Sequence, residues 1–422
     1  MTRADRGAPG APAPGQGGRV ERRLGVGPAR RGCRVVTTAM TARLLLAHQL
    51  RAIDEVRWTV VSGDRFDDAP PGLEVEIVPI RREFALSDVG AALRLWRLFR
   101  RERFDFVQTH TPKASFLGLP AARLAGTRAV YTIHGALWFR DNTRLANLLG
   151  WLFERWCCAW AHVVLVQSEE DRVVLPMVGI CRAAKIRYVG NGVDLDRFSA
   201  AVDPADLGHD APPSPVSAPG AAVASGPATR PVVVMVSRLV REKGCLDFFA
   251  LARTLRGRAT FVHVGPTEDD QSDAISAGEL AAAAPDVTFL GAVGDIRPQL
   301  AAADLVVQPS YREGIPRVAM EASAAGRCVV AYDVRGMREV VDPGSGVLVD
   351  RGDTAALCAV VAGLLDDPGR RHALGQAGRA RVLERFSEDA VVTRLRAVYD
   401  ELAEAGPPRR RPGRVRAGAG AA

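Results

Sequence analysis

Two glutamates eight positions apart, Glu313 and Glu321, are the side chains whose type and spacing best suit chemistry on a ligand. Glu313 lies in a loop opened by Gly314 and Pro316, just after a strand-like run at 305–308, and Glu321 lies in the helix expected to follow. Such a junction offers free backbone N–H groups and a positive helix-dipole end, which suit a phosphate. Carboxylates beside it can accept hydrogen bonds from hydroxyls. We therefore expect a pocket for a phosphorylated, hydroxyl-rich ligand such as a nucleotide-sugar.

Two cations, Arg238 and Lys243, flank a second strand-to-helix loop, between the runs at 231–237 and 246–255. Cationic side chains and a helix N-terminus at this position can share one diphosphate. The ordinary alternative for the two clusters is a pair of exposed glutamates and a solvated basic loop. The chain has only three lysines, and two of them, Lys113 and Lys243, fall in motifs, which weighs against that alternative.

Apolar runs alternate with helical patterns along both halves, which is typical of an α/β fold with parallel sheets covered by helices on both faces. In the first half we expect strands at 35–38, 58–62, 75–79, 106–109, 129–133 and 162–167, and helices at 41–52, 88–102, 113–125 and 142–161. In the second half we expect strands at 231–237, 259–264, 287–290, 305–308, 328–332 and 346–349. Two doubly wound sheets leave a cleft between their carboxyl edges, where ligands bind. No G-x-G-x-x-G follows the first strand, which disfavours a dinucleotide site.

Length and composition, 422 residues with 47% hydrophobic and 25% charged, fit a soluble protein of two domains. No uncharged apolar run is long enough to cross a bilayer, and the Arg-rich start has Gly and Pro where a signal peptide needs an apolar core. We therefore expect a cytoplasmic protein. Seven cysteines without C-x-x-C spacing argue against structural zinc and a disulfide framework.

The net charge of +8 is concentrated at the two ends of the chain. Residues 1–34 carry +6 and residues 406–422 carry +5, which leaves −3 for the rest. Excess charge in Gly/Pro/Ala-rich ends does not form a folded basic groove, so we expect no nucleic-acid partner.

Several motifs occur in the order in which one enzyme family carries them. They are Ser237-Arg-Leu239 with Glu242-Lys-Gly244, Glu313-Gly-Ile-Pro316 to Glu321-Ala, Gly326 with Val329-Val-Ala331, Gly336 with Glu339-Val-Val341, Gly346-Val-Leu-Val349, His110-Thr-Pro-Lys113, Tyr131-Thr-Ile-His134-Gly135 and Gly192-Val-Asp194. On these residues the chain resembles glycosyltransferase family 4, the retaining GT-B enzymes. The His-Thr-Pro-Lys pattern resembles the branch that builds polysaccharides and lipid-linked oligosaccharides. The resemblance implies two Rossmann-like domains facing across a cleft.

With this resemblance the chain divides into six parts. We expect a disordered basic extension at 1–32, an acceptor-side domain at 33–200, an Ala/Pro-rich linker or insertion at 201–230, a nucleotide-sugar-binding domain at 231–385, a helix crossing back to the first domain at 386–404 and a disordered basic tail at 405–422.

The resemblance also implies donor-side roles. Arg238 and Lys243 match the basic pair that holds the donor diphosphate and stabilises the charge developing on the leaving group. Glu321 matches the glutamate that binds the ribose hydroxyls, and Glu313 matches the one near the donor sugar. Backbone N–H groups around Gly314, Ile315 and Pro316 would complete these contacts, although Pro316 itself has none to give.

On the acceptor side, His134 matches the histidine that faces the donor sugar, although a lone histidine at a strand end is more often structural. His110 and Lys113 follow the preceding strand and are further candidates for the acceptor side. Lys113 either contacts a phosphate or is a first-turn helix residue in water. Thr38 stands where many relatives have a Gly-rich loop, so hydroxyls there would replace glycine amides.

We expect no metal and no cofactor, since the nucleotide-sugar is a co-substrate and cations serve its diphosphate. Asp194-Leu-Asp196 mimics the D-x-D signature of metal-dependent sugar transferases but lies in a segment that the family uses as an interdomain loop. The implied mechanism is retention without a covalent intermediate: the acceptor hydroxyl attacks from the face that the diphosphate leaves.

The acceptor is less defined by the sequence than the donor. UDP-sugars are the favoured donors by resemblance, and a saccharide or polyprenyl-linked acceptor is expected. The expected helices at 88–102 and 142–161 carry arginines among aromatic and aliphatic residues, so they are candidates for contact with the inner face of the cytoplasmic membrane. Ordinary packed helices with solvated arginines are the alternative. A noncatalytic nucleotide-sugar-binding protein and a transferase acting on a small soluble acceptor stay open.

Overall fold

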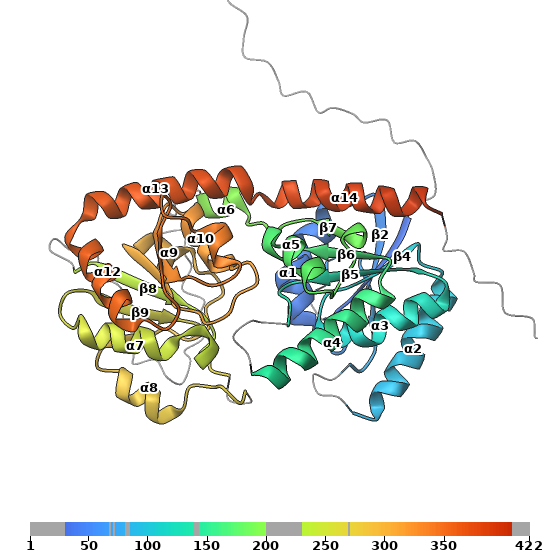
Figure 1. Cartoon of the computed structure of the whole chain (residues 1–422), viewed down its shortest axis with the longest axis horizontal. Helices are drawn as coiled ribbons and strands as arrows, with labels where there is room; N and C mark the ends of the chain where they lie inside the picture. Colours follow the sequence, from blue (N-terminus) through green and yellow to red (C-terminus); the bar gives the residue numbers. More distant parts are fainter. Residues whose placement is uncertain are drawn as a thin grey trace, which may run out of the picture.

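Two parallel-sheet α/β domains make up the protein (Figure 1). The computed structural model describes residues 30–66, 69–70, 72–80, 85–137, 143–199, 230–268 and 271–406. The predicted GT-B class, with two doubly wound parallel sheets, is confirmed. Most of the residues assigned to the extension, the linker and the tail lie outside the described residues.

The first sheet has seven strands in the order β3-β2-β1-β4-β5-β6-β7. The strands are β1 (Arg30–Val35), β2 (Val56–Ser62), β3 (Glu74–Ile77), β4 (Phe106–Thr109), β5 (Arg128–Ile133), β6 (Val163–Val166) and β7 (Ile186–Tyr188). The helices of this half are α1 (Ala39–Ala52), α2 (Ser87–Glu102), α3 (Pro112–Ala125), α4 (Arg144–Trp160), α5 (Glu169–Met177) and the short α6 (Leu195–Ser199). Apolar side chains of α2, α3 and α4 pack on one face of the sheet, and those of α1 pack on the other.

The second sheet has six strands in the order β10-β9-β8-β11-β12-β13. The strands are β8 (Val232–Val236), β9 (Thr260–Val264), β10 (Val287–Phe289), β11 (Leu305–Gln308), β12 (Cys328–Tyr332) and β13 (Val347–Val349). The helices are α7 (Cys245–Thr254), α8 (Ala277–Ala283), α9 (Arg297–Ala302), α10 (Arg317–Ala324), α11 (Met337–Val340), α12 (Thr354–Asp366) and α13 (Pro368–Arg385). No helix among the described residues is long and apolar enough to span a membrane.

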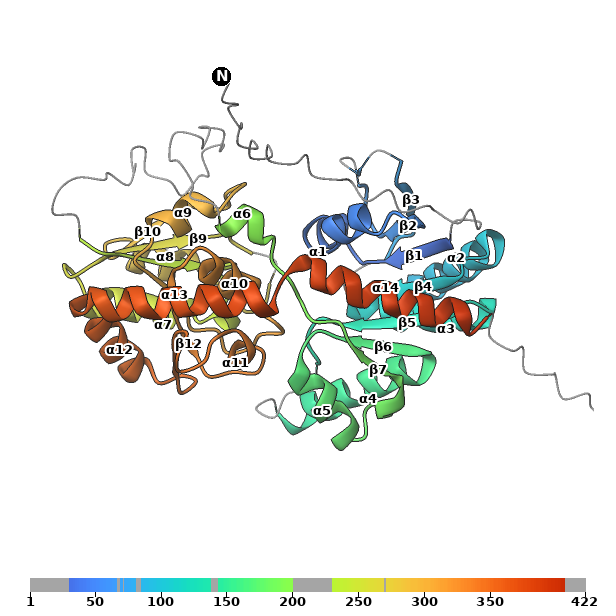
Figure 2. The ribbon, with the colours of Figure 1, turned by 90° about the horizontal axis from the view of Figure 1, so that it is seen from above.

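The last helix, α14 (Glu388–Glu404), crosses to the first domain. Figures 1 and 2 show α13 along the second domain and α14 along the first, nearly end to end. Its apolar side chains join the core on the α1 face of the first sheet. The chain also passes between domains near Gly192, where an added Cβ would lie 2.7 Å from the Cα of Glu388, and Val193 forms a parallel β-bridge with Ser387. Two crossing segments packed this closely make the junction.

The first strand begins earlier than the apolar run predicts. We expected a strand at 35–38, whereas β1 runs from Arg30 to Val35, so 30–32 are part of the sheet rather than of an extension. The arginines of this strand interrupt the apolar pattern, so the sequence does not indicate a buried strand here. The Arg34 side chain is nevertheless fully buried, and its guanidinium lies over the Trp58 ring at 4.3 Å. Gly32 is needed for packing, since a Cβ there would lie 2.7 Å from Trp58.

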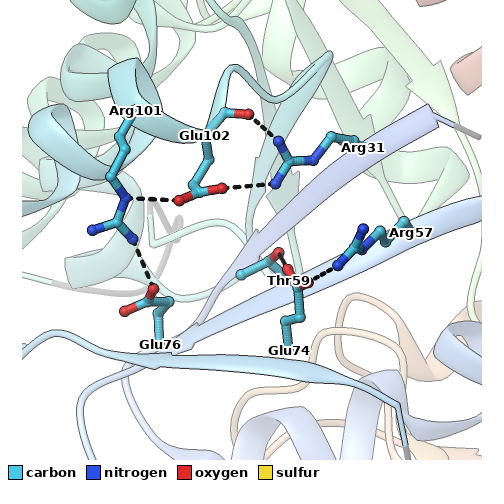
Figure 3. Close-up of polar contacts among 7 residues, drawn as sticks. All are labelled: Arg31, Arg57, Thr59, Glu74, Glu76, Arg101 and Glu102. Atoms are coloured by element: carbon cyan, nitrogen blue, oxygen red, sulfur yellow. Dashed lines mark hydrogen bonds and ion pairs between the residues drawn. The ribbon is translucent and has the colours of Figure 1, made fainter.

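Ion pairs connect the C-terminal end of α2 to strand β1 and to the edge strand β3 of the first sheet (Figure 3). Arg31 of β1 donates to the Glu102 carboxylate at 2.7 Å, and Arg101 pairs with both Glu102 and Glu76 of β3. Ion pairs this exposed to water contribute little to stability. Because Arg101 is paired with two acids, α2 presents less unpaired positive charge than its sequence indicates.

We predict that Tyr399→Phe destabilises the protein by about 1–3 kcal/mol, the cost of leaving a buried polar group unpaired. The Tyr399 hydroxyl donates to Gln108 at 2.6 Å and accepts from Arg34 at 3.2 Å, all three side chains being buried. Urea unfolding measures the change. Thr393→Ala, on an exposed position of the same helix, is the control and should stay within about 0.5 kcal/mol of the parent; equal effects of the two substitutions would contradict the prediction.

Candidate functional site

Two strand-to-helix loops of the second domain are joined through their backbones at the carboxyl edge of the sheet. The Tyr311 N–H donates to the Glu242 carbonyl at 2.9 Å. Gly244 has a φ of 74°, and a Cβ there would lie 1.9 Å from the Pro309 carbonyl oxygen, so only glycine allows this approach. The loop after β8 and the loop after β11 therefore form one structural unit.

Lys243 and Glu313, predicted separately from the sequence, are in direct contact in that unit. The Lys243 Nζ lies 2.7 Å from the Glu313 Oε1, with 19% and 13% of the two side chains exposed. Arg238 is placed differently: it lies 3.7 Å from Glu268 and is 45% exposed. A partly buried cation–carboxylate pair at a sheet edge can exchange its mutual contact for contacts with a charged, hydroxylated ligand.

The loop after Glu313 packs directly on the other domain. A Cβ on Gly314 would lie 1.9 Å from the His134 carbonyl oxygen, and Gly135 lies against the Gly314 backbone. Gly336, with a φ of 79°, backs the same loop, where a Cβ would lie 1.4 Å from the Gly314 oxygen. The predicted donor loop and the predicted His134 are therefore brought together across the domain boundary.

His134 is held by side chains of the two neighbouring strand ends. Its Nδ1 lies 3.2 Å from the Gln167 Oε1, so Nδ1–H donates to that oxygen, and its Nε2 lies 3.2 Å from the His110 Nδ1. Desolvation by the surrounding protein lowers the pKa of His134 to about 4, and burial together with the neighbouring His134 places the pKa of His110 well below its usual value. Both imidazoles are therefore neutral near pH 7. The Nε2 of His134 then carries no proton and accepts a hydrogen bond from the His110 Nδ1–H.

Ile315 and Pro316 end the loop, and Glu321 lies in α10 directly after it. The Glu321 side chain is buried on α10, and burial raises its pKa while Arg317, 3.6 Å away, opposes that rise. Pro316 is the residue before the first turn of α10, and the Ile315 carbonyl accepts from the Asn191 Nδ2 at 3.5 Å. A buried carboxylate one turn into a helix can accept hydrogen bonds from hydroxyls that reach it.

Thr38 and Lys113 differ in their surroundings. Thr38 immediately precedes α1, and its Oγ1 lies 3.0 Å from that of Thr41. Lys113 is buried and pairs with Asp88 at 2.8 Å, so the interpretation as a first-turn residue in water is wrong. The sequence could not reveal this, because Asp88 belongs to another helix.

The Asp194-Leu-Asp196 segment is a helix start. The Asp194 Oδ1 accepts from the Arg197 N–H at 2.9 Å, and both residues belong to the junction where the chain leaves the first domain. Among the described residues, no group of three or more His, Cys, Asp or Glu side chains is arranged to hold a metal ion.

Family comparisons agree with this geometry. The sequence model described as Glycosyltransferase Family 4 matches residues 23–197, and the one described as Glycosyl transferases group 1 matches residues 230–367. The protein belongs to glycosyltransferase family 4. It is therefore a glycosyltransferase.

The relatives of this protein include other bacterial glycosyltransferases. The putative glycosyltransferase EpsD of Bacillus subtilis is 27% identical over 76% of the chain and 83% of its own length. The UDP-Gal:alpha-D-GlcNAc-diphosphoundecaprenol alpha-1,3-galactosyltransferase of Escherichia coli is 26% identical over 67% and 72%. The structure of HepE from Anabaena in complex with UDP and glucose has a TM-score of 0.71, with 21% identity over 88% of this chain and 99% of that one, which shows the shared fold.

The transferase also has site residues that sequence reasoning missed. Glu154 of α4 is buried, its Oε1 accepts from the Leu137 N–H at 3.1 Å, and its Oε2 accepts from the Tyr131 hydroxyl at 2.8 Å. Burial raises the pKa of Glu154 to about 7. Glu154 therefore fixes the segment that carries His134. The available signal was an acid among the large apolar residues of Leu152-Phe-Glu-Arg-Trp156, where Arg155 is the other charged residue.

We predict that His134 does not titrate between pH 5.5 and 8, which NMR of the histidine ring protons can measure. Its folded pKa of about 4 is below the ordinary value of 6.5. Between these values the unfolded chain binds a proton that the native chain does not, so stability falls as pH drops, by about 1.4 kcal/mol per pH unit.

His134→Gln should therefore reduce the dependence of stability on pH between about pH 4 and pH 6.5. His372→Gln, at an exposed position of α13, is the control for the loss of a histidine elsewhere. A ring-proton midpoint near 6.5 for His134 would contradict this assignment.

Proposed function

We propose that the protein transfers a hexosyl or N-acetylhexosaminyl group from a UDP-sugar to a saccharide or polyprenyl-linked acceptor, with retention of configuration, in cell-surface polysaccharide or glycoconjugate synthesis. One observation carries the proposal: the Lys243–Glu313 pair lies at the donor loop whose Gly314 packs on His134 of the other domain. The names of the relatives support the substrate classes, since the galactosyltransferase is named for UDP-Gal and a diphosphoundecaprenol acceptor and HepE was solved with UDP and glucose.

On this proposal the two cations hold the donor diphosphate. Lys243 leaves its pair with Glu313 to contact the phosphate oxygens, and Arg238, half-exposed beside Glu268, adds the second positive charge. Both stabilise the charge that grows on the diphosphate as the glycosidic bond breaks. Glu313, released from Lys243, accepts hydrogen bonds from the sugar hydroxyls, and Glu321 accepts them from the ribose.

The transfer itself needs no enzymatic nucleophile in this scheme. The acceptor hydroxyl attacks the anomeric carbon on the face from which the diphosphate leaves, and the departing phosphate oxygen takes the acceptor proton. A neutral His134 suits this chemistry, because a cationic imidazole facing the sugar would disfavour the positive charge that develops at the anomeric carbon.

The first test is a donor screen. We expect one UDP-sugar to raise the melting temperature, with EDTA present, and to be turned over. Lys243→Ala should lower the catalytic rate about 100-fold or more, the usual loss for a preorganised charge-stabilising group. Arg258→Ala, which removes surface contacts with the Asp366 carboxylate and the Ala362 carbonyl of the same domain, is the matched control. Binding of a nucleotide-sugar with no turnover would favour a noncatalytic protein instead.

A lipid-linked acceptor would bring the enzyme to a membrane, and α4 offers a surface for this. Five large apolar side chains at helical spacing form one exposed stripe, which we call the α4 stripe: Leu145, Leu148, Leu149, Leu152 and Trp156 are 42–66% exposed. The exposed charged residues of α4 are Arg144 and Arg155, which complement anionic lipid. The stripe favours a membrane surface over a small soluble acceptor.

We predict that the double substitution Leu148→Glu and Leu152→Glu abolishes flotation with anionic liposomes and leaves hydrolysis of the donor unchanged. Both side chains are about half-exposed, so the fold does not depend on them. Leu383→Glu, a similarly exposed leucine on α13 of the other domain, is the control. Unaltered flotation of the double variant would show that the α4 stripe is not the membrane contact.

A further inference from the structure

The Glu339 carboxylate of the second domain accepts hydrogen bonds at the N-terminus of α5 in the first domain. The Glu339 Oε1 accepts from the Ser168 Oγ at 2.5 Å and from the Glu170 N–H at 3.1 Å. Ser168 also caps α5 within its own domain, accepting from the Asp171 N–H at 3.1 Å. The first N–H groups of a helix have no partner inside it and carry a partial positive charge, so a carboxylate is favourable there.

A second polar contact lies beside the first and is more deeply buried. Arg335 lies 3.1 Å from Asp171, with 10% and 3% of the two side chains exposed. A third pair, Arg338 with Glu170 at 3.6 Å, is far more exposed and contributes less. Figure 2 shows α5 and α11 on the adjoining sides of the two domains. The segment from Arg335 to Glu339 therefore attaches the second domain to the start of α5.

The same segment contacts the candidate donor site from behind. Gly336 lies within this stretch and packs on the Gly314 carbonyl, and Gly314 packs on the carbonyl of His134. On the other side of the boundary, Gln167 holds the His134 ring and is the residue before Ser168. The contacts form a closed ring, in which the polar attachment at Glu339 and the backbone contact at Gly314 support each other.

We propose that Glu339 and Arg335 are positioning residues that hold the two domains closed over the donor, fixing the donor loop against His134. This inference rests on the proposed function for its substrates but not for its geometry. Neither side chain contacts the reacting groups. Their effect is on closure: if the attachment loosens, the cleft opens more often, water enters, and the sugar is lost to hydrolysis instead of reaching the acceptor.

The test uses the full chain and compares Glu339→Ala with Glu339→Gln. The glutamine keeps an oxygen that can accept from Ser168 and Glu170, whereas alanine removes it. For the alanine variant we expect a catalytic rate about tenfold lower, a larger share of donor hydrolysed per sugar transferred, and a larger radius of gyration in small-angle X-ray scattering. The glutamine variant should show smaller changes in the catalytic rate, the hydrolysed share and the radius of gyration. Arg258→Ala is the control within the same domain and should match the parent.

A double-substitution cycle tests whether Ser168 and Glu339 act through their mutual contact or independently of each other. If Ser168 and Glu339 interact across the boundary, the combined variant Ser168→Ala with Glu339→Ala should lose less than the product of the two single losses. Unchanged scattering and an unchanged hydrolysis share for Glu339→Ala would overturn the proposal, and so would equal losses for alanine and glutamine accompanied by a lower melting temperature. Scattering needs no turnover, so a parent protein inactive on every donor would refute the proposed function and leave this test valid.

Discussion

The protein depends on one steric constraint: three backbone segments from two domains meet where no side chain fits. Gly314 lies between the His134 carbonyl and Gly336, and a Cβ on Gly314 or on Gly336 would overlap a backbone oxygen. In this closed arrangement the carboxyl edges of both sheets therefore face one another in backbone contact. The packed crossing at Gly192 and the docking of α14 satisfy the same requirement at the other end of the junction.

Much of the fold follows from apolar patterning, and the exceptions share a cause. Strands such as Leu305–Gln308 and Phe106–Thr109 match their expected limits because both faces of a parallel sheet are covered, which makes the run continuously apolar. The first strand was displaced because it contains Arg34, whose burial depends on Trp58 and on Tyr399 of the last helix. The three-residue strand Ile186–Tyr188 was not anticipated, since so short a run carries no periodicity.

Within the site, local sequence indicated which residues stand at strand ends but not which partners they meet. Lys243 and Glu313 were each identified by position, and their contact follows from the strand order that places β8 beside β11. The burial of Lys113 depends on Asp88, and the attachment of Glu339 depends on Ser168 of the other domain. Such pairings join residues far apart in sequence, so one chain without relatives to compare cannot specify them.

The pairing of Lys243 with Glu313 explains how the site tolerates two partly buried charges when no ligand is bound. Partial burial of a lone lysine or a lone glutamate would cost free energy, because the charge loses contact with water. Here each charge compensates the other at 2.7 Å. On the proposed function the donor replaces both contacts at once, its diphosphate taking the lysine and its hydroxyls the glutamate, so neither charge is left unpaired in either state. Across the domain boundary, the neutral His134 and His110 add no further charge. On this scheme, binding exchanges the partners of the two charges instead of leaving either charge unpaired.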